Sequence, residues 1–187
     1  MKTTLESLCQ RPDLLTVEFH EQDATVLIQI SAHPNDAKII VGGGGSHLSA
    51  LATLSRLLFF GSHKLVQIMP IESVEAEEMP YRKFKSKPDW NKDGLILLAN
   101  SLSNAIFPEA IVEIEVRDEN SWASRFLITI SPHQNEAAVK RYSSAMAILF
   151  VPIGTNAGRM IYASVNIPSS ATPQAGRGPR KRNGGEQ

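Results

Sequence analysis

The chain has 187 residues, 42% of them hydrophobic and 20% charged, which is the composition of a globular protein with enough apolar material for a real core. Its 19 basic and 19 acidic residues give a formal net charge of zero, which excludes a uniformly basic nucleic-acid-binding protein and leaves only a local basic patch open. The single cysteine, Cys9, excludes an intramolecular disulfide and lies among apolar residues, so we expect a buried, unreactive thiol.

Hydrophobic periodicity in residues 1–71 predicts a mixture of helices and strands. A short helix near the start ends at Pro12, and two stretches of alternating apolar and polar residues then predict two strands. Leucines at spacings of three and four predict a long amphipathic helix, which Gly61 would end. The predicted strands of this half span 14–20, 24–31 and 63–71, and its later helices span 35–41 and 48–58.

Residues 72–91 change in character, with acidic residues first, basic residues after them and two prolines among them. We interpret this segment as a charged, solvated linker; the alternative is a basic arm that touches phosphate. From residue 92 the order helix, strand, strand, helix, strand starts again. The predicted helices of this half span 93–107 and 135–150, and its strands span 109–118, 123–131 and 158–167.

An internal repeat connects the two halves. Residues 27–37, LIQISAHPNDA, align without a gap to residues 127–137, LITISPHQNEA, and seven of these eleven positions are identical. We therefore predict two copies of one α+β unit, at 1–71 and 92–168, each a mixed three-stranded sheet with helices on one face. The second copy has KRYSSAMAIL where the first has VGGGGSHLSAL, so it lacks the glycines.

Residues 169–187 are rich in Pro, Gly and Ser and almost devoid of apolar side chains, so we expect a disordered tail. This tail is basic and could contact phosphate through Arg177, Arg180, Lys181 and Arg182. No stretch has the apolar core of a signal peptide or the roughly 18 apolar residues of a membrane span. We therefore expect a soluble, cytoplasmic protein without membrane contact.

Four consecutive glycines, Gly42–Gly45, stand between two apolar runs with helical spacing. Ser46 and His47 follow them instead of the Lys-Ser or Lys-Thr pair of a Walker-type loop, and the third glycine of a dinucleotide fingerprint is absent. The remaining pattern is G-x-x-G between two helices, the first of which has Pro34 at its first position. Bare glycines there would let a nucleic-acid backbone approach the main chain closely, with amides at the start of the second helix facing phosphate.

In this context residues 1–71 resemble the small bacterial KH-domain RNA-binding proteins. The likeness covers the opening helix, the two strands, and a segment with His-Pro, Asp, a basic residue, two apolar residues, G-x-x-G, Ala and an apolar residue. The residues that carry it are His33, Pro34, Asp36, Lys38, Ile40, Val41, Gly42, Gly45, Ala50 and Leu51. The resemblance implies two tandem type II KH-like units, each with the order helix-strand-strand-helix-helix-strand, of which the second is degenerate and lacks G-x-x-G.

The resemblance also implies a site for single-stranded RNA at the glycines. Apolar side chains would form the groove floor, and the amides of Gly44, Gly45 and Ser46 would face phosphate. The predicted RNA-binding residues are Lys38, Ile40, Val41, Gly42, Gly43, Gly44, Gly45, Ser46 and His47, with Ile40 and Val41 as the floor and Lys38 and His47 flanking the phosphate.

The sequence has no Ser-His-Asp order, no Cys-His cluster, and no second ligand at metal spacing beside the repeated His33 and His133. We therefore expect no catalytic residues, no metal and no cofactor, and a structural role for these histidines. Two functions stay open: a non-catalytic RNA-binding protein with a post-transcriptional or ribosome-related role, and a protein-interaction or self-association module with little RNA affinity. The intact G-x-x-G and the basic tail favour the first, whereas the absence of a basic side chain at Gly43 and Gly44 favours the second.

Overall fold

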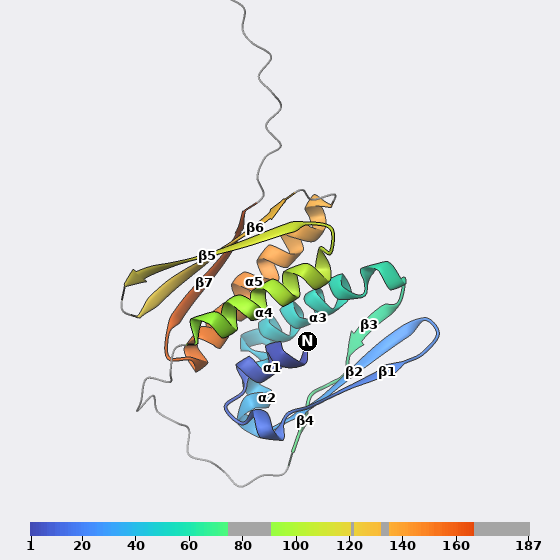
Figure 1. The fold of residues 1–187 in the computed structure, drawn as a ribbon. Helices are drawn as coiled ribbons and strands as arrows, with labels where there is room; N and C mark the ends of the chain where they lie inside the picture. The colour runs from blue at the N-terminus through green and yellow to red at the C-terminus, as the bar shows by residue number, and fades with distance from the viewer. Residues whose placement is uncertain (75–90, 121, 132–134, 167–187) are drawn as a thin grey trace, which may run out of the picture.

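The computed structural model describes residues 1–74, 91–120, 122–131 and 135–166. The chain is α+β, as predicted, with two mixed β-sheets on the outside and the helices packed between them (Figure 1). Most of the predicted linker and the whole predicted tail, including its four basic residues, lie outside the described residues. Within the described ranges, no helix is long and apolar enough to cross a membrane.

The first half forms a sheet in which the middle strand pairs antiparallel with the strand before it and parallel with the strand after the helices. Its elements are α1 (Lys2–Leu8), η1 (Pro12–Leu14), β1 (Thr16–Glu21), β2 (Thr25–Ala32), α2 (Pro34–Val41), η2 (Gly43–Gly45), α3 (Ser46–Leu58), η3 (Phe60–Ser62), β3 (Leu65–Ile68) and β4 (Glu72–Ser73).

Two sequence predictions for this half are wrong in detail. The predicted linker began at residue 72, but Glu72 and Ser73 form β4, which continues the edge of the sheet beside β2, so the sheet has four strands rather than three. Pro70 separates β3 from β4, because proline has no N–H to donate to a ladder. Gly61 does not end α3: the helix stops at Leu58 with Phe59 as its C-cap residue, and the left-handed backbone after it occurs at His63, with a φ of 56°.

The second half repeats the order and the directions of the strands: its middle strand is antiparallel to the preceding strand and parallel to the last one. Its elements are α4 (Lys92–Ile106), β5 (Ile111–Asn120), β6 (Ala123–Ser131), α5 (Glu136–Asn156) and β7 (Met160–Asn166). The residue pattern predicted one helix over 135–150 between β6 and β7, and α5 is one helix of 21 residues. The two helices that the resemblance implied at this place are not formed.

Tyr142 explains why α5 is continuous where the first half has a loop. It occupies the position that corresponds to Gly42 in the repeat, and it is fully buried. Its hydroxyl lies 2.7 Å from Oγ of Ser103 on α4, and burial raises the pKa of the phenol to about 12. An anchored aromatic side chain at this position holds the backbone in the helix, whereas glycine would favour a turn.

The two halves share one hydrophobic core. In β2 and β6 alternate residues are buried, among them Ile28 and Ile30 of the first half and Ile128 and Ile130 of the second. α3 packs against α5, and the buried apolar residues of both halves form a single cluster. The inner faces of both sheets therefore cover one helical layer from opposite sides (Figure 1).

Two buried or half-buried polar side chains tie the end of α1 to both halves. The fully buried carboxylate of Asp36 on α2 accepts hydrogen bonds from the amides of Gln10 and Arg11, at 2.8 and 2.9 Å. On the other side, Nδ2 of Asn156 at the end of α5 donates to the carbonyl oxygens of Ser7 and Cys9, at 3.1 and 3.0 Å. Asn156 thus bonds carbonyls at the C-terminal end of α1, where a helix leaves them unpaired, and Asp36 bonds the amides that follow.

Candidate nucleic-acid interface

The glycine loop joins α2 to α3, and α2 begins and ends at well-defined residues. His33 is the N-cap residue of α2: its Nδ1 accepts a hydrogen bond from the amide of Asn35 at 3.2 Å, and Pro34 stands at the first helical position. The predicted structural role of His33 therefore fits its place in the fold, while His133 lies outside the described residues. At its other end, α2 stops at Gly42, which has a φ of 71°.

Three of the four loop glycines have a left-handed backbone. The φ angles are 71° at Gly42, 61° at Gly44 and 79° at Gly45, which side chains other than glycine adopt only at a cost. Gly43 is outside this region and could take any residue without backbone strain. The backbone conformation therefore requires glycine at positions 42, 44 and 45, but it does not require glycine at position 43.

Gly42 has a second constraint, because the imidazole of His47 lies against it. A Cβ atom at Gly42 would come within 2.5 Å of Cγ of His47. Nδ1 of His47 is 2.6 Å from the carbonyl oxygen of Ile39. Since a carbonyl only accepts, Nδ1 carries the proton in this contact. The half-buried ring thus links the start of α3 to the end of α2 and fixes the base of the loop.

The tip of the loop is bare backbone. Gly43 and Gly44 are exposed, and a Cβ atom at Gly43, Gly44 or Gly45 would meet nothing within 4 Å. Two of the three amides predicted to face phosphate are used inside the loop: that of Gly45 donates to the carbonyl of Gly42 at 3.1 Å, and that of Ser46 donates to the carbonyl of Gly43. The amides of Gly43 and Gly44 lie at this exposed tip.

The other predicted site residues divide between surface and core. Lys38 is exposed on α2 and Val41 is half-buried at its end. Ile40 has 0% exposure and belongs to the hydrophobic core, so the prediction that it forms the floor of a surface groove is wrong. It lies on the same helix face as Asp36 and Ala37, which are also buried, and this face points into the molecule.

A second surface feature, which the sequence did not predict, is an open groove between α3 and α5 with a volume of about 360 Å³. The two helices come from different halves, and about ninety residues of chain separate the segments that form its walls. No local pattern in the sequence marks such a pairing. The lining residues are Ser49, Ala50 and Thr53 on α3, and Lys140, Arg141, Ser144, Ala145 and Ile148 on α5. We call this the α3–α5 groove.

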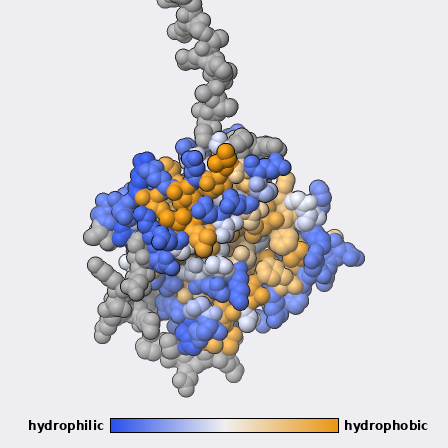
Figure 2. Space-filling model, in the orientation of Figure 1, coloured by the Kyte–Doolittle hydropathy of each residue, from blue (hydrophilic) through white to orange (hydrophobic). Residues whose placement is uncertain are grey.

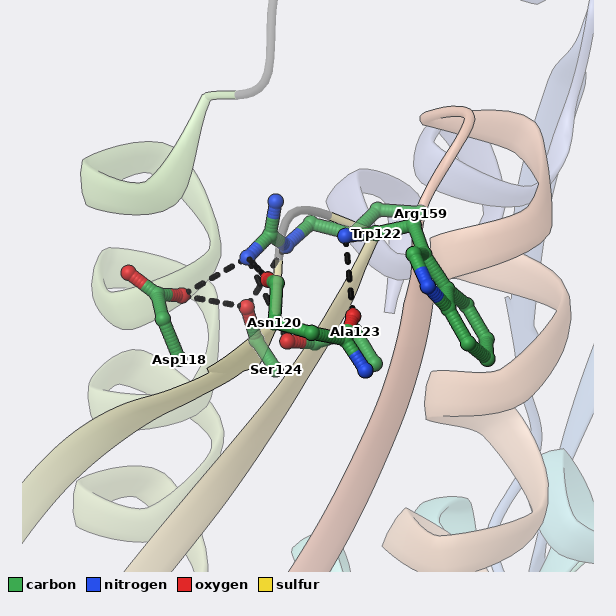
Figure 3. Close-up of polar contacts among 6 residues, drawn as sticks. All are labelled: Asp118, Asn120, Trp122, Ala123, Ser124 and Arg159. Carbon is green, nitrogen blue, oxygen red and sulfur yellow. Dashed lines mark hydrogen bonds and ion pairs between the residues drawn. The ribbon is translucent and has the colours of Figure 1, made fainter.

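A polar network in the second half, also absent from the sequence predictions, fixes the β5–β6 hairpin to the start of β7 (Figure 3). Nε of Arg159 donates to Oγ of Ser124 at 2.6 Å, and another guanidinium nitrogen lies 2.9 Å from Oδ1 of Asp118. Ser124 in turn donates to Asp118 at 2.5 Å. This hydrogen bond lowers the pKa of Asp118 below its usual value, and the charges of Arg159 and Lys92 act in the same direction.

This network is structural chemistry. The hydroxyl of Ser124 donates to the carboxylate of Asp118 and accepts from the guanidinium of Arg159, and Ser124 is fully buried, so a substrate does not reach this hydroxyl. Within the part of the chain that the structure describes, no group of three or more His, Cys, Asp or Glu side chains could hold a metal ion.

Comparison with known proteins adds no assignment: no protein-family model matches the chain, and no curated protein matches it.

Proposed function

We propose that the chain is a non-catalytic RNA-binding protein, and that its glycine loop contacts the sugar-phosphate backbone of single-stranded RNA. One observation carries the proposal: the exposed tip of the loop, at the start of α3, presents the backbone of Gly43 and Gly44 and no side chain. Backbone amides at a helix start favour an anion, and bare glycines let a phosphate approach closely.

The local charges agree with this function. No acidic residue lies between Gly42 and His47 to repel phosphate, and Lys38 is exposed on the preceding helix. Asp36, the nearest acid in sequence, is fully buried and already accepts two backbone hydrogen bonds. We further propose a cytoplasmic protein with a post-transcriptional or ribosome-related role.

The fold supports a finer proposal, that the two halves are tandem KH-like units of type II. Both sheets have the same strand order and directions, and the first half has two helices joined by the G-x-x-G turn. In the second half α5 runs unbroken through the corresponding position. Under this proposal only the first unit has a loop that can receive phosphate, and the second has another role.

Substitutions at Gly43 test the loop, since a side chain there meets neither strain nor neighbours. We expect Gly43→Asp to weaken binding of a fluorescent single-stranded oligoribonucleotide at least tenfold, by repulsion of phosphate, and Gly43→Lys to tighten it severalfold. Gly43→Ala is the matched control and should stay within about threefold of the original protein. Fluorescence anisotropy measures all three. Equal affinity in the three variants would show that the loop is only a turn.

A second candidate function is an interaction module, and a particular surface favours it. Trp122, Met160 and Tyr162 are 55%, 44% and 40% exposed and adjoin one another at the edge of the β5–β6–β7 sheet. Figure 2 shows a group of hydrophobic residues on the surface in the area of this sheet, although its hydropathy scale does not colour tryptophan and tyrosine as hydrophobic. Exposed aromatic and methionine side chains are enriched at protein interfaces. If the original protein does not bind RNA, sedimentation of a Trp122→Ser variant, compared with the original, tests whether this edge mediates self-association.

A further inference from the structure

The α3–α5 groove begins close to the glycine loop. Ser49, the first residue of α3 in the groove, lies four residues after Gly45, which is about 6 Å of helical rise. Thr53 follows one turn later on the same wall. Small side chains, Ala50 and Ala145, stand where the two helices meet, and they leave the space open. A strand that crosses the loop along α3 therefore reaches the groove after about one helical turn.

The opposite wall of the groove is positively charged. Lys140 and Arg141 are exposed on α5, and Arg141 has no ion-pair or hydrogen-bond partner among the described residues. Lys140 pairs with Glu136 at 2.7 Å, but both side chains are more than 60% exposed, so this pair is easily exchanged for another. Glu136 is the sole acidic residue of the two helices, and α3 adds the exposed Arg56. In a chain of zero net charge, this is a local excess of positive charge.

Hydroxyl groups complete the set of donors. Among the described residues the hydroxyl of the exposed Ser49 has no partner. Those of Thr53 and Ser144 donate to carbonyls one turn back on their own helices, at 3.0 and 3.1 Å, and can rotate toward a ligand. A guanidinium, an ammonium and hydroxyls around a cleft match the oxygen atoms of a phosphate group.

We infer that the α3–α5 groove binds a phosphate of the same RNA strand that crosses the glycine loop. Lys140 and Arg141 of the second half then supply the positive charge that Gly43 and Gly44 lack. The inference rests on the proposed function and gives the second half a part in it. The second half has no glycine loop, and its helix α5 instead places two basic side chains beside the loop of the first half. The shared core holds the two walls in fixed positions.

The test removes the charges of Lys140 and Arg141 and compares the loss of RNA affinity with the loss that follows removal of two basic charges elsewhere on the surface. The groove variant is Lys140→Ala/Arg141→Ala. The control, Arg117→Ala/Arg125→Ala, changes the net charge equally on β5 and β6, where the guanidinium groups pair with Glu115 and Glu119. With a fluorescent single-stranded oligoribonucleotide, we expect the groove variant to bind about tenfold more weakly and the control less than twofold. The slope of log K against log salt should become shallower by about 0.7 in the groove variant, for the one phosphate bound in the groove.

A charge-preserving exchange, Lys140→Arg/Arg141→Lys, should retain binding within about threefold. Because both side chains are exposed, the thermal midpoint of the groove variant should match that of the original protein. Equal loss of RNA affinity in the groove variant and the control would overturn the inference that the groove binds phosphate. A groove variant that binds normally, while Gly43→Asp weakens binding, would also overturn it and leave the loop function standing. Absence of RNA binding by the original protein would overturn the proposed function itself.

Discussion

At the scale of single residues, Gly42 is constrained twice and its neighbour Gly43 not at all. Gly42 has a φ of 71° and lies against the imidazole of His47, whereas Gly43 has neither a left-handed backbone nor a neighbour for a Cβ atom. The G-x-x-G pattern thus combines a glycine that the fold needs with one that the fold leaves free. Only the free position can report on binding without disturbing the structure.

We expect Gly42→Ala to lower the free energy of unfolding by about 2–4 kcal/mol. About 1–2 kcal/mol comes from the left-handed backbone and the rest from displacement of the His47 ring. Gly43→Ala should change stability by less than about 0.5 kcal/mol. Urea denaturation followed by circular dichroism measures both. Similar midpoints for the two variants would mean that the loop relaxes freely and that His47 does not fix its base.

The sequence predicted that a glycine loop joins two helices at 42–45, but not which side chains around it are accessible. Ile39 and Ile40 are adjacent and equally apolar, yet one is half-buried and the other has 0% exposure. Which of them points inward depends on the rotation of α2 about its axis, which the buried carboxylate of Asp36 and the core determine together. The sequence around position 40 therefore did not show which of the two isoleucines would be buried.

At the scale of elements, alternation in β2 and β6 and leucine spacing in α3 were enough to predict those elements within a few residues. The repeat in the sequence also predicted the common pairing of the two sheets. Hydrophobic periodicity predicted one helix over 135–150, and α5 is continuous there, whereas the resemblance implied a break into two helices. The sequence did not predict the α3–α5 groove, because its two walls come from different halves and meet only when both halves fold.

Gly154 in α5 allows β7 to pack closely against this helix. A Cβ atom there would lie 2.5 Å from the carbonyl oxygen of Arg159 and 2.9 Å from Cβ of Ile161, at the start of β7. Glycine to alanine normally stabilises a helix interior by about 1 kcal/mol, but here we expect Gly154→Ala to destabilise by about 1–3 kcal/mol through overpacking.

The matched control for Gly154 is Gly61→Ala, because a Cβ atom at Gly61 meets nothing within 4 Å and the backbone is not left-handed. It should leave the thermal midpoint unchanged within about 1–3 °C. Differential scanning calorimetry distinguishes the two variants. A gain of stability in Gly154→Ala would show that β7 moves away from α5 at little cost.

At the scale of the whole molecule, the two halves are held together by the shared core and by Asn156. Its side chain spans from the end of α5 to carbonyls at the end of α1, next to Cys9. Cys9 is 4% exposed, and burial raises the pKa of its thiol to about 12, with Asp36 and Glu6 adding to the shift. The thiolate that alkylating agents attack is therefore scarce until this region opens.

We expect Cys9 to react slowly with iodoacetamide at pH 8 in the original protein and about tenfold faster in Asn156→Ala. Loss of two hydrogen bonds to backbone carbonyls raises the population of the open form by about that factor. Asn104→Ala on the exposed surface of α4 is the control and should react at the original rate. Mass spectrometry of the intact protein follows the reaction. A fast reaction in every variant would show that α1 is not held by α5.

The packing of α3 against α5 also sets an order of events during synthesis. α3 ends at Leu58, and α5 is complete only at Asn156, about a hundred residues later. At ordinary elongation rates, the ribosome needs on the order of 5 to 20 s to make that stretch. Throughout this interval the nascent first half exposes the face of α3 that α5 will cover. The nascent chain is therefore prone to aggregation during this interval, until α5 has been synthesised and covers α3.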